Sequence, residues 1–532
     1  MAATPATSLT LISSGLADAR LQPARGNPDV AQFLKVVRKT TRWSAQWNRV
    51  DFDGDARFGQ RVTVTLPRIA ELVSAVNIVV QMPDIYTTQL AAIKAAGGTG
   101  LDAPGTFLGP VYGWTNGLGH ALIQQIELEI GGAIVESLDS RQLEIYDELY
   151  ETLDSAMAKN AMIKRVPNGF TARSLLSPIP TTVTVPIPFW FSRPGVTSHA
   201  LPLDALNAES VRIHVTFRPL NQLFYTAARV DPRTVGYRPG QDAGPMWSLL
   251  GGRFWKSNPA ATEGRVYSMN ETMPVAGISG ELIADIQFPS ILLPLSAYAL
   301  VEYISLEEYE ALAFRTAELT YQVEQHLAVP VQATLNATEL RLAIPYSNPT
   351  KELTWVFQRP EAEGYNAWFL FTRDLSGPTP PQNPAPSPCS TPWWPDAQLI
   401  PTQATRWQVV PAFQTAFSEP MAGATLLYNS YERFVEDGGS YFRTVQPALN
   451  YVKSAFHDRY VYAYNFGQRA KRGVYGPTGA ANWDKIPRKE LFVTLNRGPL
   501  GSVPPNLNLY VYVTIWNVFK VFGGRGGMLF SN

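Results

Sequence analysis

The side chains that most often bind metals or act as nucleophiles are few in this chain and lie far apart. The 532 residues include five histidines and one cysteine, which are His120, His199, His214, His326, His457 and Cys389. No histidine lies at metal-ligand spacing from another histidine or from the cysteine. Cys389 lies among prolines, without a catalytic signature around it. We therefore expect no metal, no cofactor and no catalytic residue of these types.

Two carboxylates, Glu127 and Glu129, fall two residues apart in an alternating segment, so they would share one face of a strand. A carboxylate pair facing one cleft performs glycoside hydrolysis. A carbohydrate-active or carbohydrate-binding β-sandwich protein is therefore an alternative function, although such pairs also arise by chance in β-proteins. Glu307, Glu308 and Glu310 are more simply interpreted as favourable negative charge at a helix N-terminus.

Motifs for nucleotides and nucleophilic serines are missing from the sequence. It has no GxSxG, no GxxxxGK[ST] and no GxGxxG between a strand and a helix. The glycines of GGRGG, 523–527, are typical of a turn. Two NxT sequons begin at Asn270 and Asn336, and they are glycosylation sites only if the chain meets a glycosylation machinery. With a single cysteine, the sequence favours unmodified asparagines.

Composition narrows the class of protein further. Lys and Arg total 44 and Asp and Glu total 44, so the chain lacks the basic excess that wraps a polyanion, and we expect no direct sequence-specific nucleic-acid binding. One cysteine suits a reducing compartment. The first twenty residues lack the pattern of a secretion signal, and no eighteen apolar residues run together, so we expect no transmembrane segment.

Short segments of alternating hydrophobicity, separated by Pro, Gly and Asn, dominate the chain and predict strands. The predicted strands are 61–66, 72–80, 124–130, 182–191, 211–217, 299–304, 352–358, 459–466, 490–495 and 507–516. Two helices are predicted, at 137–153 and at 305–318, the second with a capping box formed by Ser305 and Glu308. This pattern predicts an all-β fold with short inserted helices, of the sandwich or barrel type.

The strands fall into two blocks, which we interpret as a duplication of one sandwich type. The predicted divisions are an N-terminal arm at 1–29, a first sandwich at 30–225, an inter-domain connection or long loop at 226–284 and a second sandwich at 285–532. Residues 377–395 are so rich in proline that they should form an extended surface loop.

Several blocks of the sequence resemble the double jelly-roll major capsid proteins of large nucleocytoplasmic eukaryotic DNA viruses. In the first half these blocks are 126–149, 185–206 and 211–220. In the second half they are 301–314, 348–359, 442–447, 459–466, 477–486 and 510–530. The least generic are VPIPFWF followed by ALPL, and NPTKELTWVFQ. The order and the spacing of the blocks also agree with this family.

The resemblance implies a structural protein and not an enzyme. Each half would be a jelly-roll sandwich, and three chains would close into a pseudo-hexameric capsomer of an icosahedral viral shell. The implied partners are two further copies of the chain, neighbouring capsomers, and minor capsid and penton proteins. The implied location is the virion capsid, assembled in the host cell cytoplasm. Low charge and many aromatic residues suit such large repeated contacts.

Overall fold

The computed structural model describes residues 42–83, 111–165, 182–192, 199–227, 266–267, 272–276, 282–287, 295–360, 363, 368–373, 419–436, 438–455, 460–467, 479–497 and 503–530. The predictions for the arm at 1–29, the proline-rich segment at 377–395, Asn270, Cys389 and His457 lie outside the described residues.

The first sandwich consists of two antiparallel sheets. One has the order β1-β14-β3-β7, with the bounds β1 Trp43–Asp51, β14 Ser296–Leu306, β3 Leu72–Gln81 and β7 Thr182–Pro186, and the short β8 (Leu201–Pro202) also pairs with β3. The other has the order β2-β9-β5-β6, with the bounds β2 Arg61–Thr65, β9 Val211–Phe217, β5 Ile123–Ile130 and β6 Ala133–Asp139.

The second sandwich is built in the same way. One sheet has the order β15-β24-β18-β21, with the bounds β15 Leu319–Ala328, β24 Asn508–Phe522, β18 Pro349–Gln358 and β21 Val461–Asn465. It is extended by β16 (Gln332–Ala333), β22 (Ala481–Asn482) and β25 (Arg525–Met528). The other has the order β17-β23-β19-β20, with the bounds β17 Glu339–Ala343, β23 Lys489–Leu495, β19 Met421–Tyr428 and β20 Tyr431–Glu436.

Strand order identifies both sandwiches as the same fold. When the eight main strands of each are counted along the chain, one sheet holds the first, eighth, third and sixth, and the other holds the second, seventh, fourth and fifth. This order is that of an eight-stranded jelly roll. The predicted all-β fold of two consecutive jelly-roll sandwiches is therefore confirmed, and so is the duplication, which the residues themselves do not show as a repeat.

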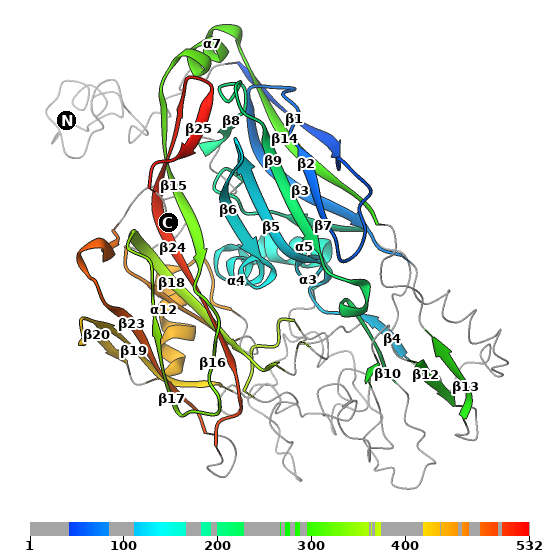
Figure 1. Ribbon diagram of the computed structural model, residues 1–532, viewed down its shortest axis with the longest axis vertical. Coiled ribbons are helices and arrows are strands. Elements are labelled where there is room, and N and C mark those ends of the chain that lie inside the picture. Colours follow the sequence, from blue (N-terminus) through cyan, green and yellow to red (C-terminus); the bar gives the residue numbers. More distant parts are fainter. Residues whose placement is uncertain are drawn as a thin grey trace, which may run out of the picture.

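Strand β14 corrects the predicted division of the chain at residue 285. Its residues pair with β1 on one side, from Trp43 opposite Leu306 to Asp51 opposite Tyr298, and with β3 on the other. It is therefore the last strand of the first sandwich, and its arrow lies among the blue strands in Figure 1. The chain passes to the second sandwich through helix α7 (Glu308–Thr316), at the top of the view. The boundary was wrong because alternation reveals strands but not their partners.

The segment 226–284 is likewise not an inter-domain connection, because both of its flanking strands, β9 and β14, belong to the first sandwich. It also contains strands. The strands are β10 (Phe224–Ala227), which begins just before the segment, β11 (Val266–Tyr267), β12 (Thr272–Ala276) and β13 (Leu282–Gln287), which ends just after it; the 3-10 turn η2 (Leu220–Gln222) precedes them. β10 pairs with β11 and with β4 (Val111–Trp114), so this insertion meets the one between β3 and β5.

Two local predictions fail for reasons of backbone geometry. Ser305 does not cap a helix, because it is still paired in β14 with Ser44, and α7 begins later with Glu307 at its N-cap. The strand predicted over 182–191 ends at Pro186, and Phe189 donates its backbone N–H to Ile187 in a turn. Phe189, Trp190 and Phe191 are nevertheless all buried, with the rings of Phe189 and Phe191 5.6 Å apart.

Candidate functional site: the junction between the sandwiches

Two helices are inserted into the first sandwich, and the first of them lies where this sandwich meets the second (Figure 1). They are α4 (Ser140–Tyr150) and α5 (Leu153–Ile163), inserted between β6 and β7, and α5 packs on the short α3 (Leu118–Leu122). The Asp139 side chain caps α4 by accepting from the Gln142 backbone N–H at 2.7 Å. The Thr152 hydroxyl accepts from the Ser155 N–H at the start of α5. These caps define the two starts, and the prediction of a helix at 137–153 is confirmed in its centre.

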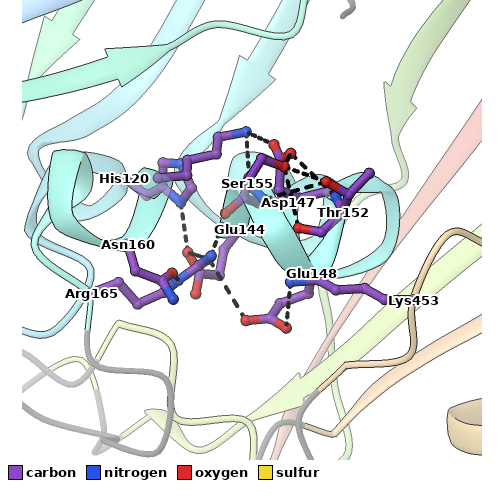
Figure 2. Close-up of polar contacts among 11 residues, drawn as sticks. His120, Glu144, Asp147, Glu148, Thr152, Ser155, Asn160, Arg165 and Lys453 are labelled. Carbon is purple, nitrogen blue, oxygen red and sulfur yellow. Dashed lines mark hydrogen bonds and ion pairs between the residues drawn. The ribbon is translucent and has the colours of Figure 1, made fainter. Parts of the chain in front are cut away.

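Arg165, just after α5, is the centre of a buried ionic cluster (Figure 2). Its side chain is fully buried and donates to Asp147 and, at 2.7 Å, to Asn160. Glu144 lies 3.2 Å from the same guanidinium, and its carboxylate is hydrogen-bonded to His120 Nδ1 at 2.6 Å. Guanidinium is the group best suited to satisfy several buried carboxylates, because it is planar and always charged.

A second cation completes the cluster. Lys159 pairs with Asp147 and, at 3.0 Å, with Glu151. Burial alone would raise the pKa of Asp147, but the positive charges of Arg165 and Lys159 lower it to about 2. Asp147 is therefore ionised at neutral pH, and its charge is balanced by neighbours inside the same sandwich.

The cluster also reaches the second sandwich. Lys453 lies 3.8 Å from Glu148 of α4, and the backbone N–H groups of Val452 and Lys453 donate to the Leu149 carbonyl at 3.2 and 3.3 Å. Lys453 follows α12 (Gln446–Asn450), a helix of the second sandwich. We call this region, formed by α4, α5 and residues 451–453, the junction.

Further side-chain hydrogen bonds cross the junction along α4. The Tyr150 hydroxyl donates to Glu352 at 2.5 Å, and the Tyr512 hydroxyl donates to Asp139 at 2.7 Å. Burial and Glu352 raise the pKa of Tyr150 well above its ordinary value, so this donor keeps its proton. Because each bond needs both partners in place, the set fixes one orientation of the sandwiches.

Apolar packing also connects the two sandwiches. Most of the buried apolar side chains of both sandwiches belong to one continuous hydrophobic cluster. Trp190 of the first sandwich lies 5.4 Å from Phe519 of β24, measured between ring centroids. At the same end, Ala208 N–H donates to Gly524 O, and Gly526 N–H donates to Glu209 at 2.9 Å. The two jelly rolls are therefore built as one unit.

Sequence reasoning located this helix but missed the cluster. The signal was present, because Glu144, Asp147, Glu148 and Glu151 recur at helical spacing on one face of the predicted helix. A stripe of this kind is usually solvated. Cations from outside α4, which are Lys159, Arg165 and Lys453, make it part of an interior.

The carboxylates proposed for carbohydrate chemistry are committed to ion pairs. Glu127 accepts from Arg61 at 2.6 Å, and Glu129 lies 2.7 Å from His214 Nε2 and 3.6 Å from Arg212. All of these side chains lie on one face of the β2-β9-β5-β6 sheet, as the alternation predicted. Because cations occupy both carboxylates, the pair gives no support to the carbohydrate alternative.

The other residues singled out by the sequence have ordinary surroundings. His326 Nδ1 lies 3.1 Å from the Thr514 hydroxyl, and His199 is half-buried. Glu308 and Glu310 lie in the first turn of α7, as predicted. Asn336 is exposed on a turn between β16 and β17. Within the described ranges, no group of three His, Cys, Asp or Glu side chains is placed to hold a metal ion.

Among the helices that the structure describes, none combines the length and the apolar character needed to cross a bilayer.

Comparison with known proteins gives a consistent result in both halves of the chain. A family described as the major capsid protein N-terminus matches residues 31–244, and the large eukaryotic DNA virus major capsid protein family matches residues 310–527. The major capsid proteins of Chrysochromulina ericina virus and of Paramecium bursaria Chlorella virus 1 are each 22% identical to the chain. The matches span 98% of the chain and 99% and 98% of those proteins.

Solved structures agree at the level of the fold. The PBCV-1 protein VP54 superimposes with a TM-score of 0.60 at 19% identity, over 94% of this chain and all of that one. The Faustovirus major capsid protein gives a TM-score of 0.57 at 10% identity, over 93% of each chain.

Proposed function

Because the chain belongs to the major capsid protein family of large eukaryotic DNA viruses, we propose that three copies of it close into a pseudo-hexameric capsomer. It is a structural component of the icosahedral virion shell and not an enzyme. What we propose beyond the family membership is the stoichiometry of three chains per capsomer.

The observation that carries the proposal is that both sandwiches have one strand order and are held together by the junction. A ring of three such chains presents six similar sandwiches, which is the number that a six-fold position in a shell requires. Head-to-tail contacts of this kind close into a ring when the rotation per chain is right. A junction that allowed the sandwiches to rotate against each other would leave the ring undetermined.

The equivalent insertions of the two sandwiches suggest where the chains meet. In the first sandwich, the insertion between the fifth and sixth strands is α4 with α5, which faces the second sandwich. In the second sandwich, the same insertion is η4 (Tyr441–Val445) followed by α12. It leaves Val445 and Leu449 exposed on one side, four residues apart. We infer that this side packs against the first sandwich of a neighbouring copy.

The test is a measurement of solution mass. Three chains of 58.7 kDa give about 176 kDa by light scattering. The double variant Val445→Glu with Leu449→Glu should give folded monomer, because two carboxylates would be buried without partners at the contact. The matched control is Leu335→Glu, an exposed leucine on a turn of the same sandwich. A wild-type monomer at micromolar concentration would contradict the trimer. A double variant that is still trimeric would contradict only the proposed position of the contact between chains.

The remaining expectations concern partners and surface features. We propose that neighbouring capsomers and minor capsid and penton proteins contact the capsomer, and that assembly takes place in the host cytoplasm.

We also propose that residues 377–395 lie on the outer surface of the shell. Protease digestion of intact particles tests this position, and cleavage elsewhere with this segment intact would contradict it. Asn336 has the exposure that a glycan needs, and mass spectrometry of virion protein tests its modification.

A further inference from the structure

A cavity of about 460 Å³ lies between the two sandwiches, beside α4. Its first-sandwich wall includes Arg141 and Arg218, and its second-sandwich wall includes Trp368 and Tyr510. The two arginines lie over these rings, with the guanidinium carbon of Arg218 3.6 Å from the Trp368 ring centroid and that of Arg141 4.0 Å from the Tyr510 ring centroid. Stacking holds both guanidinium groups in fixed orientations.

The two arginines differ in their counter-charges. Arg141 pairs with Glu363, and its Nε donates to Gln358 at 2.8 Å. Its charge and its hydrogen-bonding capacity are therefore used within the protein.

Arg218 has no such partner among the described residues. It is 5% exposed, and the side-chain hydrogen bond that it makes is donated to the neutral Ser140 hydroxyl at 2.7 Å, while its Nε is buried without an acceptor. Burial and the neighbouring charge of Arg141 lower its pKa to about 10, so it remains cationic at neutral pH. A buried cation that lacks a paired anion costs several kcal/mol. By contrast, Arg165 and Arg443 each lie within 4 Å of a carboxylate.

The carboxylates in the cavity wall do not fill this role. Glu363 is engaged by Arg141 and by the Tyr510 hydroxyl at 3.1 Å. Asp139 accepts from the Gln142 backbone and from Tyr512. Neither lies within 4 Å of Arg218, although both reduce the positive potential of the cavity. A ligand here should therefore be small and carry a low charge.

We propose that this cavity binds a small oxyanion such as phosphate, held by the guanidinium of Arg218. The planar fork of an arginine matches the oxygens of phosphate, and the amides of Gln124 and Gln222 in the same wall supply further donors. The ligand would neutralise Arg218 and join the walls contributed by the two sandwiches. Binding would thus stabilise their orientation, whether or not the chain is trimeric.

Thermal unfolding of the purified full chain tests this proposal. Phosphate is titrated against chloride at constant ionic strength and pH, and binding is measured in parallel by calorimetry. We expect a Tm increase of roughly 1 to 2 °C in phosphate about ten- to fifty-fold above its Kd, and none in chloride. Arg218→Met should abolish both the increase and the calorimetric signal. Without phosphate it should be as stable as the wild type, because it removes an unpaired buried charge.

Two further variants keep the test decisive. Arg443→Met removes a buried arginine that has a carboxylate partner, so it should lower Tm yet keep the response to phosphate. Arg218→Lys keeps one charge without the fork and should retain a weakened response, even if the methionine variant does not fold. An equal response of wild type and both Arg218 variants would place the anion elsewhere, and the absence of phosphate binding by the wild type would overturn the proposal.

Discussion

The two jelly rolls share their strand order but differ in how their interiors and insertions are filled. The first sandwich places a cluster of charged side chains in the helical insertion between its fifth and sixth strands. The second fills the corresponding region with aromatic rings. Trp355 packs on Phe442 of this insertion at 5.3 Å and on Tyr462 of β21 at 5.9 Å, measured between ring centroids. One topology therefore tolerates two opposite chemistries at the same place.

The difference follows from what each insertion contacts. The insertion of the first sandwich faces the second sandwich, where hydrogen bonds and ion pairs select one orientation. The insertion of the second covers its own core, where Phe442 is fully buried, and one ion pair, Arg443 with Glu419 at 3.1 Å, accompanies it. Apolar packing supplies stability without a specific direction, whereas buried polar contacts tolerate few alternatives. We conclude that the insertion of the first sandwich fixes the orientation of the two sandwiches, whereas the insertion of the second sandwich stabilises its own core.

The largest effect is expected from breaking the aromatic interior. Trp355→Ala removes a fully buried ring, which typically costs about 3 to 5 kcal/mol of the 5 to 15 kcal/mol that holds a domain. Phe189→Ala should cost a similar amount in the first sandwich. We expect both to abolish soluble trimer, and urea unfolding of any soluble fraction measures the loss. Because the core is continuous, the two sandwiches should unfold in one transition. Two separate transitions in the Trp355 variant would show that they are independent.

The second-largest loss of stability is expected from removing a charge from the cluster in the insertion of the first sandwich. Arg165→Met leaves Glu144 and Asp147 buried beside fewer cations, and we expect a loss of about 3 kcal/mol, the lower end for a broken buried pair, because Lys159 remains. The free energy of unfolding in urea measures it. Adding Glu144→Gln and Asp147→Asn to Arg165→Met should restore much of the stability. If the triple variant were no more stable than the single one, lost packing and not unpaired charge would be the cause.

Features that depend on neighbouring residues could be predicted from the sequence, whereas contacts between residues far apart in the chain could not. In β9, Val211, Ile213, Val215 and Phe217 alternate and are all buried, because alternation is a local consequence of strand geometry. The helix at α4 was equally visible. The partners of β14 and the cations that complete the junction were not, since both bring together residues far apart in the chain. The oxyanion cavity was invisible for the same reason, because its walls come from both sandwiches.

Acid should weaken the charged insertion more than the aromatic one. The pKa of Asp147 is about 2 in the folded protein against a usual 3.8, so its stabilisation is fully present above about pH 4 and is lost as pH falls through 2. The shift corresponds to about 2 kcal/mol. We expect wild type to lose about that much more stability than Asp147→Asn between pH 4 and pH 2, measured by urea unfolding at each pH. Parallel curves for the two proteins would mean that Asp147 does not titrate differently on unfolding.

The smallest effect is expected at the exposed ion pair of the first sandwich, where the effect of charge can be measured without that of burial. Arg61 and Glu127 are as close as the buried pairs, at 2.6 Å, but half of the Arg61 side chain is in solvent. Water screens the attraction, so Glu127→Gln should change the free energy of unfolding by about 0 to 1 kcal/mol, against about 3 kcal/mol for Arg165→Met. The trimer should form normally in this variant, and neither protein should hydrolyse glycans. A loss as large as that of Arg165→Met would mean that the pair is buried at a contact within the capsomer, and a glycan-hydrolysing activity that disappeared with Glu127 would restore the enzymatic alternative.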